Sequence, residues 1–386
     1  MKKNKPVRTV TAAGVKFDCR HFHGHIPCDP NKLRGKICDS CDEYEAITKN
    51  ILMIKLGAIG DVIRTTPLVT AFRKKHAGCR ITWVTNTPEV LPPDLVDDAR
   101  RPDTLGLFPV LREKFDIAVN LDKDREACMI LAGVGSTKKF GFTWKDGHIW
   151  PATPAAAGKL LTGLFDRISK ENTLSYLEEI FGVCGMKFSG EEYIIRRDSA
   201  AEERWKKRTA SYGGGKSVVG LNTGCGKRWT TRLWPEDYWL GLIDRLMRAG
   251  YFPLLMGGKD EDELNASYAR KTGAWYPGHF PLAEFISASA SADVVVTQVS
   301  MMMHIAIALR KPLVLMNNIF NPREFELYGR GVIVQPDSGC DCYYGSVCTR
   351  TRRCMLDLRV DRVYDEIVRL AGPATGNAPR TPSGTR

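Results

Sequence analysis

The chain has 386 residues, of which 43% are hydrophobic and 26% are charged. This balance excludes a fibrous or intrinsically disordered protein, and the length allows two packed domains. The formal net charge of +12 favours anionic partners such as nucleotides, phosphorylated glycans or an anionic membrane surface. Because the positive charge is spread along the chain, without an array of basic and aromatic residues, we expect no nucleic acid among the partners.

Neither a membrane span nor a secretory signal is predicted. The longest apolar stretch, residues 294–318, is interrupted by Gln298, His304 and Arg310, so it predicts buried core. The charged start of the chain is not followed by an apolar segment or a small-residue cleavage site. We therefore expect a cytoplasmic protein.

The first predicted region, residues 1–48, is rich in cysteine. In a cytoplasmic chain, a group of four cysteines favours a metal over disulfides, and free thiols are the alternative. The candidate metal ligands are Cys19, Cys28, Cys38 and Cys41, with His21, His23 and His25 as substitutes.

An N-terminal α/β domain is predicted over residues 49–195. Strand-like runs at 50–57, 79–86 and 114–122 alternate with helical patterns, which predicts a parallel sheet covered on both faces. Residues 136–156 are rich in glycine, proline and aromatics, which is typical of a hairpin or a substrate-facing loop.

An acid follows the glycine-rich turn after the first predicted strand. Gly57 and Gly60 allow the backbone to approach a ligand, but their spacing with Asp61 is not that of the dinucleotide-binding motif. Two roles are open for Asp61: it caps the following helix, as aspartates at this position commonly do, or it acts as a base. Asp122, at another strand end, could orient an acceptor or be an ordinary loop acid.

A second α/β domain is predicted over residues 196–372, where strand and helix patterns alternate again. Three loops after its strands favour a nucleotide diphosphate: a basic loop, a Gly-Gly turn followed by an acid for the ribose, and a helix start. The candidate donor-binding residues are Thr223, Gly224, Lys227, Arg228, Arg232, Gly257, Gly258, Glu261, Ser300, Met301 and His304.

Taken in order, four stretches make the chain similar to glycosyltransferase family 9, the lipopolysaccharide heptosyltransferases, over residues 50–371. They are "ILMIKLGAIGDVIRTTPLVTAFR", "VVGLNTGCGKRWTTRLWPEDYW", "LLMGGKDEDE" and "VVVTQVSMMMHIAIALRKPLVLMNN". The resemblance implies an α/β fold of the GT-B type, in which two Rossmann-like doubly wound domains face a central cleft. The acceptor would bind the N-terminal half and the nucleotide sugar the C-terminal half.

The resemblance also implies roles for individual residues. Asp61 matches the acid that activates the acceptor hydroxyl, which favours the base over the cap. Arg232 falls where the family commonly has a lysine on the diphosphate, Glu261 matches the ribose acid, and His304 matches the histidine of the last motif. The implied reaction is an inverting transfer that requires no divalent metal, because the basic loop and the helix start stabilise the leaving diphosphate.

One motif departs from the family. Members usually carry Asp-Ser-Gly or Asp-Thr-Gly before the last helix, where this chain has Val299, Ser300 and Met301. The missing acid would contact the donor sugar, so the identity of that sugar stays open. A nucleotide-sugar-binding or scaffold protein without catalysis is therefore an alternative.

A second cysteine cluster lies near the end of the chain and is compact enough to surround one tetrahedral zinc or iron ion; an iron–sulfur cluster is the less favoured option. Its members are Cys340, Cys342, Cys348 and Cys354. The cluster resembles the iron-binding cysteine finger of autotransporter heptosyltransferases in residue type and placement, which raises a protein glycosyltransferase as a further alternative. Residues 373–386 are predicted to be a disordered tail.

The leading prediction is a glycosyltransferase that takes a nucleoside-diphosphate sugar, with an ADP-linked heptose or a related sugar expected. Its acceptor would be lipopolysaccharide core or another glycolipid at the inner face of the membrane. The basic charge suits peripheral contact with that anionic surface.

Overall fold

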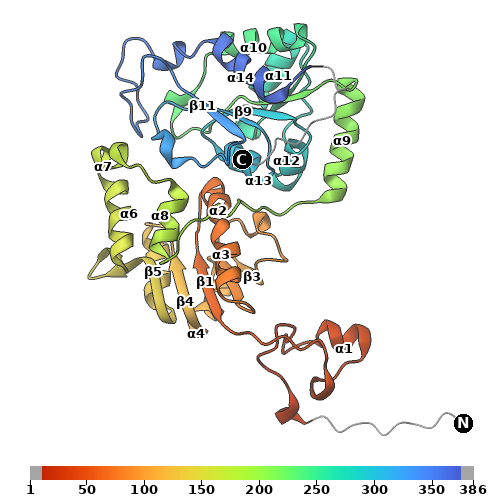
Figure 1. The fold of residues 1–386 in the computed structure, drawn as a ribbon, viewed down its shortest axis with the longest axis vertical. Coiled ribbons are helices and arrows are strands. Elements are labelled where there is room, and N and C mark those ends of the chain that lie inside the picture. The colour runs from red at the N-terminus through yellow and green to blue at the C-terminus, as the bar shows by residue number, and fades with distance from the viewer. Residues whose placement is uncertain (1–10, 375–386) are drawn as a thin grey trace, which may run out of the picture.

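The structure is a computed structural model, and residues 11–374 are described here. Figure 1 shows two α/β domains stacked along the long axis, with the N-terminal segment projecting from the N-terminal domain. Residues 1–10 and most of the predicted tail, 375–386, lie outside the described residues.

The N-terminal domain contains a six-stranded sheet in the order β3-β2-β1-β4-β5-β6. Its first five strands in this order are parallel, and β6 pairs antiparallel with β5. The order of the parallel strands is that of a Rossmann fold, whose ligand site lies where the order reverses, here between β1 and β4. The strands are β1 (Asn50–Ile54), β2 (Arg80–Val84), β3 (Asp98–Arg100), β4 (Lys114–Asn120), β5 (Gly135–Lys145) and β6 (His148–Pro151).

The antiparallel pair β5 and β6 confirms a hairpin in the glycine-rich and aromatic-rich segment. Three helices follow it, and α8 begins with a capping box in which Ser175 and Glu178 satisfy each other's backbone amides. The helices of this domain are α2 (Ile59–Thr65), α3 (Pro67–Lys75), α4 (Thr104–Arg112), α5 (Arg125–Gly133), α6 (Pro154–Leu164), α7 (Asp166–Glu171) and α8 (Tyr176–Val183), with a 3₁₀ turn at Pro88–Val90.

The C-terminal domain contains a five-stranded sheet in the order β11-β10-β9-β7-β8. Trp275 forms a parallel bridge with Leu254 of β8, and this bridge extends the sheet beyond β8. Counted with that bridge, the order is again that of a Rossmann fold, and the reversal lies between β7 and β9. The strands are β7 (Val218–Asn222), β8 (Phe252–Met256), β9 (Val294–Gln298), β10 (Leu313–Met316) and β11 (Gly331–Val334).

The helices of the second domain alternate with its strands as the sequence predicts. Helix α10 follows Pro235, and Gly250 takes a left-handed backbone conformation just after it. The helices are α9 (Ser199–Gly213), α10 (Glu236–Arg248), α11 (Asp262–Thr272), α12 (Leu282–Ser289), α13 (Met301–Ala308) and α14 (Val360–Ala371), with 3₁₀ turns at Thr230–Arg232, Lys259–Glu261, Pro322–Glu324 and Cys354–Leu356.

The two domains share buried apolar surface. One cluster of buried side chains includes Val62 of α2 and Met303 of α13, and these two helices pack against each other across the domain boundary. The residues between α8 and α9 bond to both domains. Ile194 and Arg196 donate backbone N–H groups to Thr66 Oγ1 (2.9 Å) and Val90 O (2.8 Å), and Glu192 pairs with Arg310 (2.7 Å) and Arg330 (2.9 Å).

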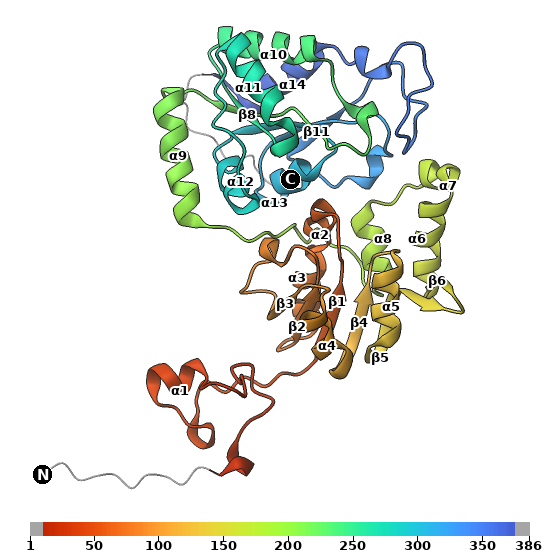
Figure 2. The same ribbon diagram turned by 180° about the vertical axis from the view of Figure 1, so that it is seen from behind.

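The N-terminal segment, residues 11–49, contains α1 (Asp29–Arg34) and 3₁₀ turns at Ala12–Gly14 and Cys38–Ser40. It projects from the N-terminal domain at the end away from the C-terminal domain in both views (Figures 1 and 2). None of the helices in residues 11–374 is both long enough and apolar enough to cross a bilayer.

Candidate active site

The site lies where the reversal points of the two sheets face each other. Helix α2 follows β1 in one domain, and α13 follows β9 in the other. Their contact brings Asp61 of α2 next to His304 of α13. Doubly wound sheets bind ligands at such reversal points, so this junction is the first candidate for the active site.

Asp61 lies in the first turn of α2 and pairs with Arg64. Arg64 Nε is 2.8 Å from Asp61 Oδ1, and the Asp61 side chain is 33% exposed. Burial disfavours the carboxylate, but the positive charges of Arg64 and Lys55 outweigh this and hold the pKa of Asp61 below its ordinary value. The Asp61 carboxylate is therefore ionised and partly open to solvent.

Lys55 and Asp122 form a buried ion pair at the ends of β1 and β4. Asp122 also accepts a hydrogen bond of 2.5 Å from the Leu56 backbone N–H. Burial disfavours the Lys55 ammonium, but the negative charges near it, including Asp61 and Asp122, raise its pKa. The structure thus places Asp122 in a bond that joins the two central strands, and it is 4% exposed.

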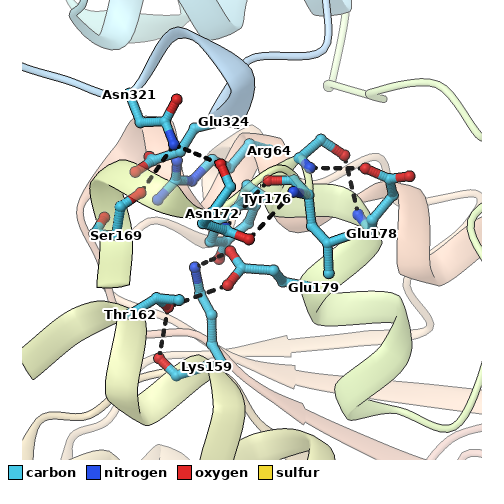
Figure 3. A network of polar contacts seen from close by, with 12 residues as sticks. Arg64, Lys159, Thr162, Ser169, Asn172, Tyr176, Glu178, Glu179, Asn321 and Glu324 are labelled. Atoms are coloured by element: carbon cyan, nitrogen blue, oxygen red, sulfur yellow. Dashed lines mark hydrogen bonds and ion pairs between the residues drawn. The ribbon is translucent and has the colours of Figure 1, made fainter. Parts of the chain in front are cut away.

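Arg64 is also part of a wider set of polar contacts, and Figure 3 shows it with Tyr176 and Glu324. Its guanidinium carbon lies 3.5 Å from the ring centroid of Tyr176, which is a close cation–π contact. Burial disfavours the guanidinium charge, but Asp61 more than offsets it, and the pKa of Arg64 is raised. Glu324, from the C-terminal domain, also contributes negative charge to Arg64.

The same network holds the two domains together (Figure 3). Asn321 Nδ2 donates to the carbonyl oxygens of Ser169 (2.9 Å) and Asn172 (2.8 Å), and Ser169 Oγ lies 2.8 Å from Tyr343 OH. Beneath them, Lys159 pairs with Glu179, and Thr162 Oγ1 donates to Glu179 at 3.1 Å. The segment of α7 and the residues just after it is therefore bonded directly to the C-terminal domain.

His304 is buried against the N-terminal domain. It is 6% exposed, its ring lies 6.0 Å from that of Tyr193, and its Nδ1 has no hydrogen-bond partner among the described residues. Burial and the Arg64 charge lower its pKa to about 3, so the imidazole is neutral at physiological pH.

Arg232 is a buried cation without a counter-ion. It is 6% exposed and donates hydrogen bonds to the carbonyl oxygens of Val299, Cys225 (2.5 Å) and Trp229 (3.3 Å). No carboxylate of residues 11–374 forms an ion pair with it, and burial lowers its pKa. An unpaired buried guanidinium is suited to bind a diphosphate.

The other cations of the basic loop are on the surface. Lys227 pairs with Asp260 at 2.7 Å and its side chain is 82% exposed, and Arg228 lies over the Trp229 ring with its guanidinium carbon 4.4 Å from the centroid. Thr223 Oγ1 donates to Asn265 at 2.6 Å. Among the three predicted cations, Arg232 therefore has the clearest position for a bound anion.

Glu261 lies against the basic loop. Its carboxylate accepts the Gly258 backbone N–H at 3.0 Å, and a β-carbon at Gly224 would lie 2.1 Å from Glu261 Oε1. A β-carbon at Gly257 would lie 2.7 Å from the Glu261 β-carbon. Gly224 is therefore required by the close approach of the loops after β7 and β8, and Gly257 by the tight turn of the loop after β8.

Val299, Ser300 and Met301, the motif that departs from the family pattern, lie at the start of α13. Ser300 caps this helix and accepts the Met302 backbone N–H at 3.2 Å. Val299 is 8% exposed, and its carbonyl oxygen accepts a hydrogen bond from Arg232. The motif thus contacts the buried cation through its backbone.

The C-terminal cysteines lie near one another, and the Cys342 backbone N–H donates to Cys340 Sγ at 3.4 Å. Asn318 Nδ2 also lies 3.5 Å from Cys354 Sγ. Within residues 11–374, no three histidine, cysteine, aspartate or glutamate side chains are gathered in the arrangement of a metal site. A metal at either cysteine cluster stays a prediction.

Sequence reasoning did not identify Arg64, Tyr176 or Glu324 as part of the site. The pairing of Arg64 with Asp61 could have been predicted from their spacing, because residues three apart on a helix are neighbours. Tyr176 and Glu324 come from distant parts of the chain, and no local pattern predicts their approach.

Comparisons with known proteins give a family match and several structures of the same fold. The sequence profile of "Glycosyltransferase family 9 (heptosyltransferase)" matches residues 105–336. No curated protein sequence matches the chain. Several solved structures, all below 25% sequence identity, share its fold.

A family 9 glycosyl transferase from Veillonella parvula is 20% identical with a TM-score of 0.62, and the match covers 85% of this chain and 98% of that one. The E. coli ADP-heptose lipopolysaccharide heptosyltransferase II is 17% identical with a TM-score of 0.59, covering 83% and 98%. TibC, an iron-containing dodecameric glycosyltransferase from enterotoxigenic E. coli, is 16% identical with a TM-score of 0.52, covering 84% and 76%.

Proposed function

Since this chain belongs to glycosyltransferase family 9, we propose that it transfers a heptose or a related sugar, with inversion, from an ADP-linked donor to a hydroxyl group. The proposed acceptor is lipopolysaccharide core or another glycan. The ADP-heptose named for the E. coli structural neighbour supports this choice of donor. The observation that carries the proposal is the ionised Asp61 at one reversal point, opposite a domain whose reversal point holds the unpaired Arg232.

In the proposed reaction, Asp61 accepts the proton of the acceptor hydroxyl as its oxygen attacks the anomeric carbon. A new carbon–oxygen bond forms on one face of the sugar, and the bond to the diphosphate breaks on the other face. The leaving diphosphate takes the electron pair, and its charge is stabilised by Arg232. The proposal needs no divalent metal because side chains supply the positive charge.

The donor sugar would be held differently from that of related enzymes. Val299 cannot donate or accept a hydrogen bond through its side chain, and it stands where the resemblance implies an acid. We therefore expect the sugar specificity to differ from that of enzymes with the Asp-Ser-Gly motif. A binding or scaffold role would be the conclusion if the nucleotide sugar binds without turnover.

We also propose that the protein acts in the cytoplasm and contacts the anionic inner membrane face peripherally. Helices α6 and α7 and the residue between them expose apolar side chains, and the chain as a whole is strongly basic. The apolar side chains are Leu161, Leu164, Phe165 and Ile168. Sedimentation with anionic and with neutral vesicles tests this contact. Equal binding to both kinds of vesicle would contradict a contribution of the basic charge to membrane binding.

The test of the main proposal is a panel of nucleotide sugars, incubated with glycan acceptors while the release of ADP, UDP or GDP is followed. Asp61→Asn should lower transfer by about 10²- to 10⁴-fold, because the general base is lost. Asp166→Asn, at an exposed acid on α7, is the matched control and should keep wild-type activity. Transfer that persists unchanged in Asp61→Asn would exclude this residue as the base.

A further inference from the structure

The four N-terminal cysteines line a single cavity. The cavity has a volume of about 310 Å³ and lies within residues 15–44. Its walls include Cys19, Cys28, Cys38 and Cys41, and of these Cys38 and Cys41 belong to one 3₁₀ turn. Phe22, Ile26 and Ile37 supply apolar wall, and His21 and His23 also face it.

The segment around this cavity has almost no hydrophobic core. Of residues 11–49, Pro30 alone is buried, whereas Phe17 is 66% exposed and Leu33 is 70% exposed. Its regular structure is limited to α1, two 3₁₀ turns and a bridge between Cys19 and Ala46. Segments of this size need a disulfide, a metal or a partner to stay folded, because they bury too little apolar surface.

Three of the four thiols lie at a turn or at the start of a helix. Cys38 and Cys41 are the first residue and the C-cap of a 3₁₀ turn, in the C-x-x-C spacing of metal half-sites. Cys28 is the N-cap residue of α1, and its side chain makes no capping bond. All four cysteines are free thiols of intermediate exposure.

From these observations we propose that Cys19, Cys28, Cys38 and Cys41 together bind a thiophilic metal centre that folds the N-terminal segment. The thiols line the cavity without three of them meeting at one point among the described residues. Binding therefore draws them inward, since sulfur atoms around a single zinc lie about 2.3 Å from the metal. Each thiol loses its proton and binds as a thiolate, and Lys16 and Lys36 on the cavity wall offset the resulting negative charge.

The centre is structural and lies outside the proposed reaction. The segment joins the N-terminal domain through Arg20, which pairs with Asp97 and donates to Cys79 O at 2.7 Å, and through Thr48 Oγ1, which donates to Ala77 O at 2.6 Å. It lies at the far end of that domain from the junction of α2 and α13 (Figure 2). Loss of the metal should unfold residues 11–49 and leave both α/β domains folded.

The experiment uses the full chain, purified without chelator and without oxygen, with zinc, iron and acid-labile sulfide measured per chain. The double variant Cys38→Ser/Cys41→Ser should lose about one zinc per chain, or the corresponding iron and sulfide, relative to the wild type. Cys184→Ser, which removes a thiol buried in the N-terminal domain, should keep the wild-type metal content. The difference between the variants isolates this centre from any metal at the C-terminal cysteines.

A second measurement uses the wild type alone and does not depend on how the variants fold. Alkylation followed by mass spectrometry should find the four N-terminal thiols protected, and a chelator should expose them while proteolysis begins within residues 11–49. Equal metal content in the wild type and the double variant would overturn the proposal. Thiols that react equally with and without chelator, or that are paired as disulfides, would overturn it as well.

Discussion

Gly60 of α2 lies so close to His304 of α13 that a β-carbon at position 60 would come within 2.5 Å of His304 Cδ2. The two helices belong to different domains, so the missing side chain at Gly60 sets how closely the domains approach. The glycine that the sequence assigns to acceptor approach therefore has a contact with the opposite domain.

Gly60→Ala should weaken the domain contact. The added methyl group overpacks the α2–α13 junction, which we expect to cost about 1–3 kcal/mol and to displace Asp61 enough to lower transfer about tenfold or more. Thermal unfolding and steady-state kinetics measure the two effects. Gly158→Ala, in α6, has no heavy atom near the new β-carbon and should be neutral or slightly stabilising. A Gly60→Ala protein with wild-type stability and activity would mean that the helices separate easily.

His304 should make the protein sensitive to acid. Its pKa is about 3 in the folded state, against an ordinary value of 6.5. Between these values the unfolded state binds a proton that the folded state does not, so stability falls as the pH falls below about 6.5. At pH 5 this contribution amounts to about 2 kcal/mol.

The test compares the wild type with His304→Asn from pH 7.5 to pH 5. The variant removes the titrating group, so its melting temperature should fall less steeply with acid than that of the wild type. Parallel curves for the two proteins would show that His304 is protonated without penalty.

Arg64→Gln should shift the pH profile of the reaction. Arg64 lowers the pKa of Asp61, so without it the carboxylate takes up a proton at higher pH. Because the base must be ionised, the acidic limb of kcat/KM should move to higher pH. Arg167→Gln, at a side chain that is 88% exposed on α7, should leave the profile unchanged. If the acidic limb of the pH profile does not move in Arg64→Gln, the ionisation that this limb reports does not belong to Asp61.

Arg232→Met should weaken binding of the nucleoside diphosphate. Without the Arg232 guanidinium, the proposed charge-assisted hydrogen bonds to the diphosphate are lost. We therefore expect the Kd for ADP or the donor to rise about 10- to 100-fold. Arg232→Lys retains the charge but loses the planar fork, so its effect should be intermediate. Arg248→Met, on the surface of α10, is the control for net charge. Calorimetry with ADP measures all three, and an unchanged Kd in Arg232→Met would place the diphosphate elsewhere.

The fold could be predicted from the sequence because its signals are local. Alternating strands and helices indicate two doubly wound sheets, and the glycine and aromatic residues of 136–156 indicate the β5–β6 hairpin. The bridge at Trp275 could not be predicted, since one residue pair leaves no periodic pattern, and yet it completes the strand order of the second sheet.

The site was predictable only in part. Asp61, Glu261 and Ser300 stand at strand ends and helix starts, and such positions can be read from the chain. The partners of these residues come from elsewhere: Gly60 meets His304, and Arg232 meets the Val299 carbonyl. Such contacts depend on the packing of one domain on the other, which periodicity does not describe.

The connection between α8 and α9 determines how the domains can separate. Its backbone at Ile194 and Arg196 is bonded to the N-terminal domain, and Glu192 is paired with two arginines of the C-terminal domain. If the two domains move apart, one of these sets has to break, and the ion pairs are the set that dissolved salt weakens. The ionic strength of an assay would then act on the distance between the domains as well as on the binding of anionic substrates.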